Sequence, residues 1–221
     1  MPADIGGYLS SPSNREKVLE LFGEHVVLAV APLLIGLAVA VPLGWTAQRV
    51  GWLRTAVLAA AGVLYTVPSL ALFVIMPGIL GTRILDSANV VVALALYTCA
   101  LLVRPVVDAL DSVPDHVVTA ATAMGYRPAR RFLAVELPMA VPVLAAGVRV
   151  ASVSNISLVS VGAFIGIGGL GQLFTEGFQT RYLTPIVIGI AATLALALAM
   201  DLLLVWLRRM ASPWLRAGAG A

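Results

Sequence analysis

The chain has 221 residues, of which 60% are hydrophobic and 11% are charged, and its mean hydropathy is +0.99. This composition excludes an ordinary soluble domain and predicts an all-α, multi-pass membrane bundle, because backbone polar groups in hydrocarbon must be hydrogen-bonded within their own segment. The net charge of +3 does not indicate a nucleic-acid-binding protein, since the charged residues collect at the ends of apolar runs.

Five apolar runs have about the length needed to cross a bilayer. They cover residues 26–45, 57–80, 90–106, 139–161 and 185–207. With the N-terminus outside, nine arginines fall on the cytoplasmic side and four Arg or Lys residues fall outside. The positive-inside rule therefore favours an N-out, C-in topology. We expect a transmembrane domain over residues 25–209 and a short cytoplasmic tail over residues 210–221.

The first 24 residues are more polar and are expected to form a separate external segment. A Ser-x-x-Glu capping box begins at Ser13, and Glu16, Glu20 and Glu24 recur on one helical face. This pattern predicts a short amphipathic helix at the outer surface. It lacks the basic start and cleavage site of a signal peptide, so we expect the segment to be retained.

The first two spans carry small residues and a proline. Gly36, Ala40 and Gly44 have the four-residue spacing that lets two helix backbones approach closely in lipid, which indicates packing and nothing more specific. In the second span, Pro68 removes a backbone hydrogen bond and frees a carbonyl that Thr or Ser can partly satisfy. Two interpretations stay open, an ordinary kink or a broken helix that lines a solute path. Tyr65, Pro68 and Ser69 are the path candidates of this segment.

A polar loop, residues 107–138, separates the third and fourth spans. Pro114 and Asp115 favour the start of a helix, and Gly125 can end it in a left-handed conformation. The alanines between them, at positions 120, 121 and 123, give a small-sided helix that can enter a groove on a partner. Arg127, Arg130 and Arg131 are expected to anchor the next segment at the anionic inner leaflet. Leu137 and Pro138 are expected to turn the chain back into the membrane.

The fourth span contains Arg149, which lies on one arc with Ser152, Ser157 and Ser160. A charge within a span usually faces the bundle interior or a water-filled cavity, which makes Arg149, Ser152 and Ser160 path candidates. The alternative is that Arg149 extends to the headgroups. Asp201 near the end of the last span is a candidate ion-pair partner.

The segment after the fourth span contains a formal G-x-G-x-x-G at Gly166, Gly168 and Gly171. It lacks the preceding strand and the later acidic residue of a dinucleotide site. We expect instead a glycine-rich break at the outer end of the span, followed by a short amphipathic helix through Phe174 and Phe178.

Apart from this formal match, the sequence contains no motif that is typical of a catalytic or nucleotide-binding site. A phosphate-binding P-loop needs a Gly-Lys-Ser/Thr sequence, and Lys17, the sole lysine, does not have that context. The lone cysteine, Cys99, lies in a span, and His25 and His116 are far apart in this topology, so we expect no metal site. The chain is predicted to need no cofactor of its own and to leave ATP binding to another subunit.

The order Ala120-Ala121, Gly125, hydrophobic-x-Leu137-Pro138 resembles the cytoplasmic EAA loop of ABC importer permeases, in which a short helix docks on an ATPase subunit. Thr119 stands where that motif usually opens with Glu, and Arg127 follows the glycine. The strings around Pro68 and over residues 162–174 resemble the permeases for glycine betaine, carnitine and choline. The resemblance covers about residues 25–206.

This resemblance implies the type I ABC importer permease fold in a bacterial plasma membrane. The implied partners are ABC ATPase subunits, an external solute-binding protein, a second permease copy or paralogue, and the lipid bilayer. A permease for methionine or another amino acid is the alternative cargo assignment. An ATP-independent carrier is the alternative transport mechanism, but it would be expected to show internal repeats and paired intramembrane carboxylates, and the sequence shows neither. A membrane-embedded enzyme is disfavoured because the sequence contains no plausible catalytic cluster.

Overall fold

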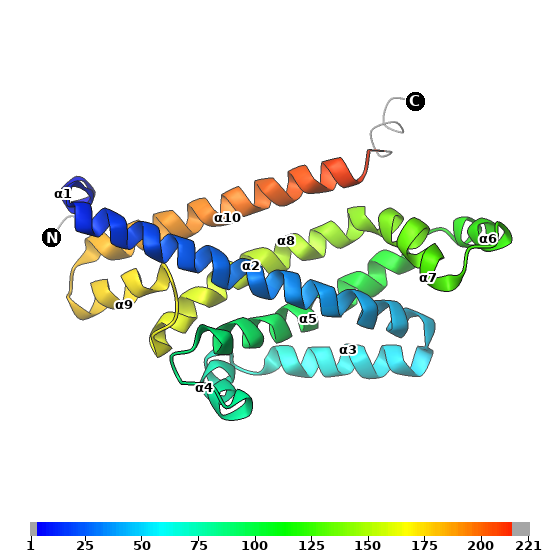
Figure 1. Ribbon diagram of the computed structural model, residues 1–221, viewed down its shortest axis with the longest axis horizontal. Helices are drawn as coiled ribbons and strands as arrows, with labels where there is room; N and C mark the ends of the chain where they lie inside the picture. Colours follow the sequence, from blue (N-terminus) through cyan, green and yellow to red (C-terminus); the bar gives the residue numbers. More distant parts are fainter. Residues whose placement is uncertain (1–3, 214–221) are drawn as a thin grey trace.

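The computed structural model describes residues 4–213, and within this range every regular element is a helix. The elongated arrangement is shown in Figure 1. The elements are α1 (Ile5–Ser10), α2 (Pro12–Arg49), α3 (Gly51–Thr66), α4 (Ser69–Leu80), α5 (Ser87–Asp111), α6 (Asp115–Ala123), α7 (Pro128–Arg131), the π-helix η1 (Phe132–Glu136), α8 (Leu137–Gly162), the 3-10 helix η2 (Ala163–Ile165), α9 (Gly171–Gln179) and α10 (Leu183–Ala211).

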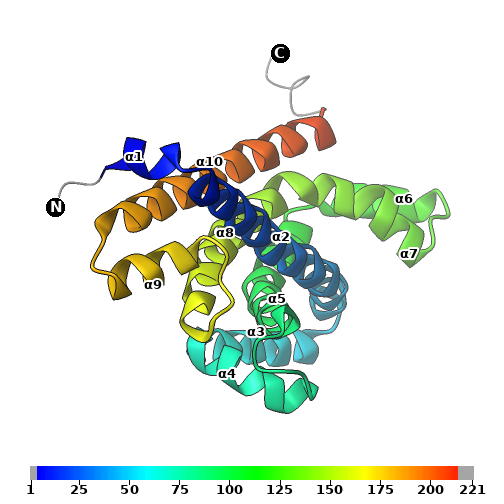
Figure 2. The ribbon, with the colours of Figure 1, turned by 60° about the vertical axis from the view of Figure 1, so that its left-hand side comes forward.

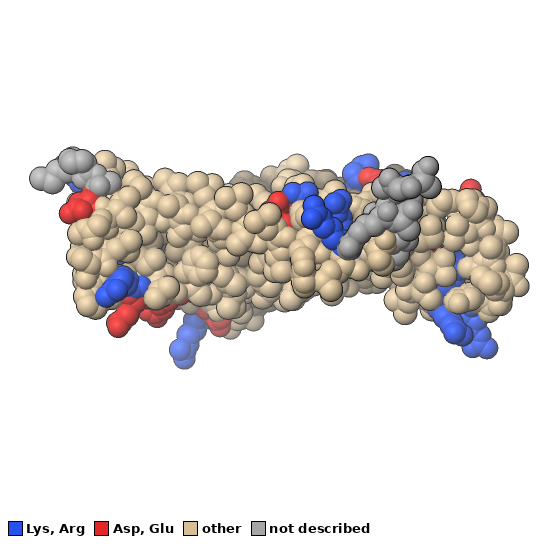
Figure 3. All heavy atoms as spheres, turned by 90° about the horizontal axis from the view of Figure 1, so that it is seen from above, with Lys and Arg blue, Asp and Glu red and all other residues tan. Residues whose placement is uncertain are grey.

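The predicted all-α bundle of about five spans is confirmed. Among the described residues, four helical stretches are long and apolar enough to cross a membrane, namely Pro12–Arg49, Ser87–Asp111, Pro128–Ile165 and Leu183–Ala211. The pair α3 and α4 meets the same criteria together but is bent by 103°. Most of the face in Figure 3 is uncharged, as expected for a lipid-facing surface, with charged atoms gathered in a few clusters.

The two ends of the chain differ from the expected boundaries. The expected separate helix with a capping box at Ser13 is wrong, because α2 begins at Pro12, after an N-cap at Ser11 without a side-chain bond, and continues unbroken past residue 24. Proline is favoured in the first helical turn, and no strong breaker follows before the span. At the other end α10 extends to Ala211, and residues 214–221 of the expected tail lie outside the described range.

The core forms where α2 packs along α5 and α8 packs against both of them, at the centre of the view in Figure 2. The predicted small-residue packing is confirmed. Gly36, Ala40 and Gly44 are all buried. A Cβ atom on Gly36 would lie 2.5 Å from Cβ of Thr98, and one on Gly44 would lie 2.4 Å from Cγ1 of Val106. The glycines therefore set how closely the two helices approach.

The molecule has two distinct ends. Helices α1 and α9 lie at one end, and α6 and α7 lie at the other (Figure 1). A buried polar cluster lies between them, where the side-chain amide of Asn155 on α8 donates to Oγ1 of Thr98 on α5 (2.9 Å) and to the carbonyl of Ala29 on α2 (3.4 Å). Polar contacts of this kind hold helices together in lipid, where unsatisfied groups are costly.

Candidate coupling and translocation sites

The loop between α5 and α8 contains the expected helix. Its N-cap is Pro114, and Asp115 occupies the first helical turn, where a negative charge is favourable against the helix dipole. Ala121 is 1% exposed and packs inward, whereas Thr119 and Ala120 face outward. Helix α6 lies at one end of the molecule (Figure 1), so its exposed residues offer a small-sided helical surface to the surroundings.

Gly125 ends α6 as predicted. Its φ is +81°, and its N–H donates to the carbonyl of Thr122 (2.9 Å) while the N–H of Tyr126 donates to that of Ala121 (3.2 Å). These two bonds are the Schellman arrangement, which favours glycine at the left-handed position. The turn fixes the direction in which α7 leaves α6.

The expected turn at Leu137 and Pro138 is wrong. The chain passes from α7 through the π-helix η1 directly into α8, so both residues lie in one continuous helical stretch. Pro138 cannot donate a hydrogen bond to the preceding turn, and the wider π turn lies immediately before it, closed by the bond from the Leu137 N–H to the Phe132 carbonyl. The reversal of the chain occurs earlier, from Gly125 to Arg127.

The basic residues of the loop do not all have the expected surroundings. Arg131 turns inward: its Nε donates to Oε1 of Glu136 (2.6 Å) and its Nη1 donates to Oγ1 of Thr122 (2.6 Å). The guanidinium of Arg130 lies over the Tyr126 ring, at 5.2 Å from its centroid, and Arg127 is exposed. Arg131 is therefore an internal link between α6 and η1, which corrects its assignment as a leaflet anchor.

Glu136 is a functional candidate that the sequence analysis missed. Its side chain is 6% exposed. It accepts from Arg131 and also from Nη2 of Arg49 at the end of α2, with distances of 3.2 and 3.3 Å to its two oxygens. The available signal was one acidic residue shortly after two arginines at the edge of an apolar run. The ion pair with Arg49 could not be predicted from the local sequence, because Arg49 lies 87 positions away.

The path candidates of the second span lie at the sharp break between α3 and α4. The carbonyl that Pro68 leaves without its helical donor is that of Leu64, and it accepts from the N–H of Val67 (3.2 Å) instead of from the expected Thr or Ser. At the break itself, the hydroxyl of Tyr97 on α5 donates to the carbonyl of Val67. Tyr65 packs edge-on against Tyr97, with ring centroids 5.9 Å apart. Pro68 is the N-cap of α4, and Ser69 is its first residue. The break is thus present, while its part in solute passage stays a prediction.

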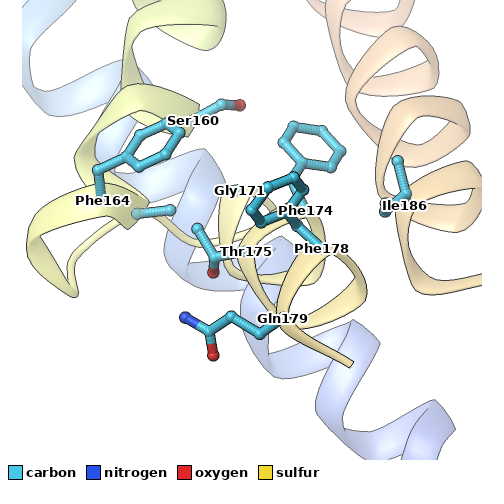
Figure 4. Close-up of a pocket in the computed structure, with 9 residues that line it drawn as sticks. Ser160, Phe164, Gly171, Phe174, Thr175, Phe178, Gln179 and Ile186 are labelled. Carbon is cyan, nitrogen blue, oxygen red and sulfur yellow. The ribbon is translucent and has the colours of Figure 1, made fainter. Parts of the chain in front are cut away.

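The path candidates of α8 do not form one site. Arg149 makes a two-pronged ion pair with Asp201 of α10, at 2.6 and 2.7 Å, which confirms the expected partner. Ser152 is buried at 3% exposure. Ser160 lines a hollow of about 630 Å³ near α9, together with Phe164, Phe174 and Phe178 among others. Figure 4 shows these side chains around the hollow between α8, α9 and α10.

The glycine-rich break and the following short helix are confirmed. Gly166 and Gly169 have φ values of +86° and +47°, and α9 carries Phe174 and Phe178. His25, earlier given no role, holds this segment. Its Nδ1 accepts from the N–H of Leu170 (3.2 Å), so its Nε2 donates to the carbonyl of Ile156 (3.0 Å). A Cβ on Gly169 would lie 2.8 Å from the His25 backbone nitrogen, which leaves room for glycine alone.

The described residues form a bundle of apolar helices that a polar helical elbow, α6 and α7, interrupts between its third and fourth crossings, which is the architecture of a multi-pass membrane protein. Residues 33–213 match the family described as "Binding-protein-dependent transport system inner membrane component". The chain belongs to this family. It is thus a multi-pass protein of the bacterial plasma membrane that works with ATPase and solute-binding partners.

Named relatives and solved structures agree with this family. The chain is 31% identical to the choline transport system permease protein OpuBD of Bacillus subtilis, over 94% of this chain and 91% of that protein. It is 34% identical to the osmoprotectant import permease protein OsmW of Salmonella typhimurium, over 95% and 94%. The fold resembles a chain of the inward-facing MetNI methionine ABC transporter, with a TM-score of 0.73, 23% identity, and coverage of 85% and 93%. The structural likeness establishes the type I permease fold.

Proposed function

We propose that the chain is the permease subunit of an ATP-driven importer for quaternary-ammonium osmoprotectants, the class that includes glycine betaine, carnitine and choline. The cargo assignment is supported by the solutes for which the relatives that match over most of this chain are named. Matches that cover 94–95% of this chain are named for choline, for osmoprotectants, and for glycine betaine, carnitine and choline together.

In this proposal the N-terminus is outside, and the end that carries α6 faces the cytoplasm. Helix α6 docks on a separate ATPase through its outward side, which includes Thr119 and Ala120. The chain supplies no P-loop, so ATP is bound by the partner. ATP binding draws two docking helices together and switches the path from inward-open to outward-open, and hydrolysis resets it. Because Thr119 replaces a glutamate, this contact has one negative charge fewer than in the usual motif.

The solute path forms between this chain and a second copy or a paralogue. Its candidates are the break at Pro68 with Tyr65 and Ser69, the Arg149–Asp201 pair, and Ser160 at the aromatic hollow. Ser152 is less suited to contact solute because its side chain is buried within the bundle. Selection of the cation rests with the binding protein, where aromatic rings can surround a quaternary ammonium.

The central test is purification of the chain with its native companions, followed by ATPase measurements. We expect an ATPase subunit to copurify, and a binding protein loaded with glycine betaine, choline or carnitine to stimulate hydrolysis. A chain that copurifies without any ATPase contradicts the importer assignment. Stimulation by methionine alone contradicts the cargo and leaves the importer assignment intact.

A second test addresses orientation. In a Cys99→Ser background, a cysteine placed at Tyr126 should be protected from a membrane-impermeant thiol reagent in intact cells. The matched control is Thr180→Cys, at the exposed C-cap of α9, a helix that lies at the opposite end of the molecule from α6 (Figure 1), and it should be labelled. Labelling at position 126 with protection at position 180 would reverse the topology and remove α6 from the reach of a cytoplasmic ATPase.

A further inference from the structure

We propose that Glu136 is a positioning residue that transmits the movement of the coupling helix α6 to the end of α2. This inference rests on the proposed function, because it assigns a route by which a motion imposed on α6 reaches the membrane helices. It identifies a residue outside the part of the loop that would contact the ATPase, and it joins three segments that are separate in the sequence.

The route is a continuous set of polar contacts. Thr122 of α6 accepts from Arg131 (2.6 Å), Arg131 donates to Glu136 (2.6 Å), and Glu136 accepts from Arg49 at the end of α2 (3.2 Å). The guanidinium of Arg49 also lies over the Trp45 ring, 4.6 Å from its centroid. Each link is a direct side-chain contact, so a displacement of α6 changes the geometry around Glu136 and then the position of Arg49.

The Glu136 carboxylate is buried, so it is stable only while it has a positively charged partner. The side chains of Glu136 and Arg131 are 6% and 16% exposed, and a buried charge that loses its partner is strongly destabilising. One carboxylate serves two arginines, and the polar hollow of about 280 Å³ beside them is also lined by Asp111 and Asp115. Asp111 also pairs with Arg54 (2.8 Å), and together with Asp115 it offers the two arginines other acidic partners when the network is rearranged.

The local backbone suits such a rearrangement. Glu136 is the last residue of the π-helix, a widened turn that carries one extra residue relative to an α-helix. Widened turns of this kind inside helices are frequently found at functional sites. Phe132 begins the same turn and stacks on Trp45 with ring centroids 4.9 Å apart. The π-helix is therefore attached to α2 at both of its ends.

The experiment uses the complete importer in proteoliposomes, with glycine betaine, choline and carnitine each tested as the transported probe. Glu136→Gln keeps the size of the side chain and removes its charge. We expect ATP hydrolysis stimulated by the loaded binding protein to remain, while solute taken up per ATP hydrolysed falls about tenfold, the effect of losing one charge-assisted hydrogen bond. The matched control is Lys17→Gln, which breaks the more exposed pair with Glu176 between α2 and α9 (2.6 Å), outside the network around Glu136, and should leave the ratio unchanged.

Two further variants separate coupling from folding. Thr122→Val removes the hydrogen bond between Arg131 and α6 at an exposed site, and it should lower uptake per ATP without lowering the unfolding temperature. Arg49→Gln combined with Glu136→Gln should cost no more coupling than Glu136→Gln alone, because both act through one link. A purely structural role predicts a lower unfolding temperature with an unchanged ratio, and that result would overturn the proposal.

The failure of this inference differs from failure of the proposed function. If the wild-type chain copurifies with an ATPase and imports solute, but Glu136→Gln and Thr122→Val couple as well as the wild type, the route is wrong and the importer assignment stands. If the wild-type chain recruits no ATPase, both are wrong.

Discussion

The seam between α2 and α5 and the outward face of α10 are built in opposite ways. Along the seam, Gly36 and Thr98 are buried, and the side-chain amide of Asn155, which is buried on the neighbouring α8, donates to Oγ1 of Thr98. Along α10, large apolar side chains are exposed, among them Leu194 (59%), Leu198 (66%) and Trp206 (54%). The seam is a completed interior, whereas the face of α10 is a surface whose apolar contacts must come from lipid or from another chain.

We therefore expect substitutions at the seam to change the stability of the protein, and substitutions at the polar contacts of α10 to change transport. At the seam, dispersion contacts and a buried polar cluster are complete within one chain, so substitutions there should appear as lost stability. On α10, the Arg149–Asp201 pair links the helix to α8 with side chains 40% and 29% exposed. Substitutions at this pair should appear in transport.

Gly36→Ala should have the largest effect on stability. The new Cβ would lie 2.5 Å from Cβ of Thr98 and 2.9 Å from the Ala95 carbonyl, so α2 and α5 must separate. We expect a loss of about 2–3 kcal/mol, as for overpacked cores, measured by thermal unfolding in detergent.

The control for this prediction is Gly62→Ala on α3, where the added Cβ would meet no atom within 4 Å apart from its own helix backbone and neighbouring residues. It should leave stability unchanged or raise it by up to about 1 kcal/mol, since alanine favours helix more than glycine does. Equal effects of the two substitutions would mean that close approach of backbones does not define the seam.

Asn155→Ala should have an intermediate effect. It leaves Thr98 without its side-chain partner and removes the link to Ala29. Interhelical polar contacts in membranes are modest, so we expect a loss of about 1–2 kcal/mol, measured in the same way. Ser157→Ala, at an exposed position of the same helix, is the control and should unfold like the wild type.

Removing the ion pair between Arg149 and Asp201 should have the smallest effect on stability. The double variant Arg149→Ala/Asp201→Ala deletes both charges and leaves none uncompensated, so its unfolding temperature in detergent should match that of the wild type. Solute uptake in proteoliposomes should fall if the pair borders the path. Normal uptake by Arg149→Ala alone would remove Arg149 from the path candidates.

Local chemistry predicted much of the fold. The helix start at Pro114, the left-handed end at Gly125 and the break at the glycine-rich segment each depend on neighbouring residues, and each is present. The expected turn at Leu137-Pro138 failed because a π turn before Pro138 lets the helix continue. At Pro68 the sequence could not distinguish an ordinary kink from a broken helix. The 103° bend between α3 and α4 decides for a broken helix, and it is stabilised by packing against α5, which is distant in the sequence.

The candidate sites were less predictable because their key contacts join distant segments. Asp201 was identified as the partner of Arg149, since both are charges inside spans and few others were available. Glu136 and His25 were not recognised, because their partners lie 87 and 131 positions away and are an arginine at a helix end and a backbone carbonyl. Neither arrangement has a periodic or compositional signature.

Helix α2 has a consequence for the membrane around it. Lys17 near its start pairs with Glu176 of α9 (2.6 Å), and Arg49 at its end pairs with Glu136. These two residues are separated by about 48 Å along an α-helix, close to the roughly 40–45 Å thickness of a bilayer with its headgroups. A thicker bilayer would draw one ion pair into hydrocarbon, so the rate of uptake should fall as the acyl chains of the surrounding lipid are lengthened.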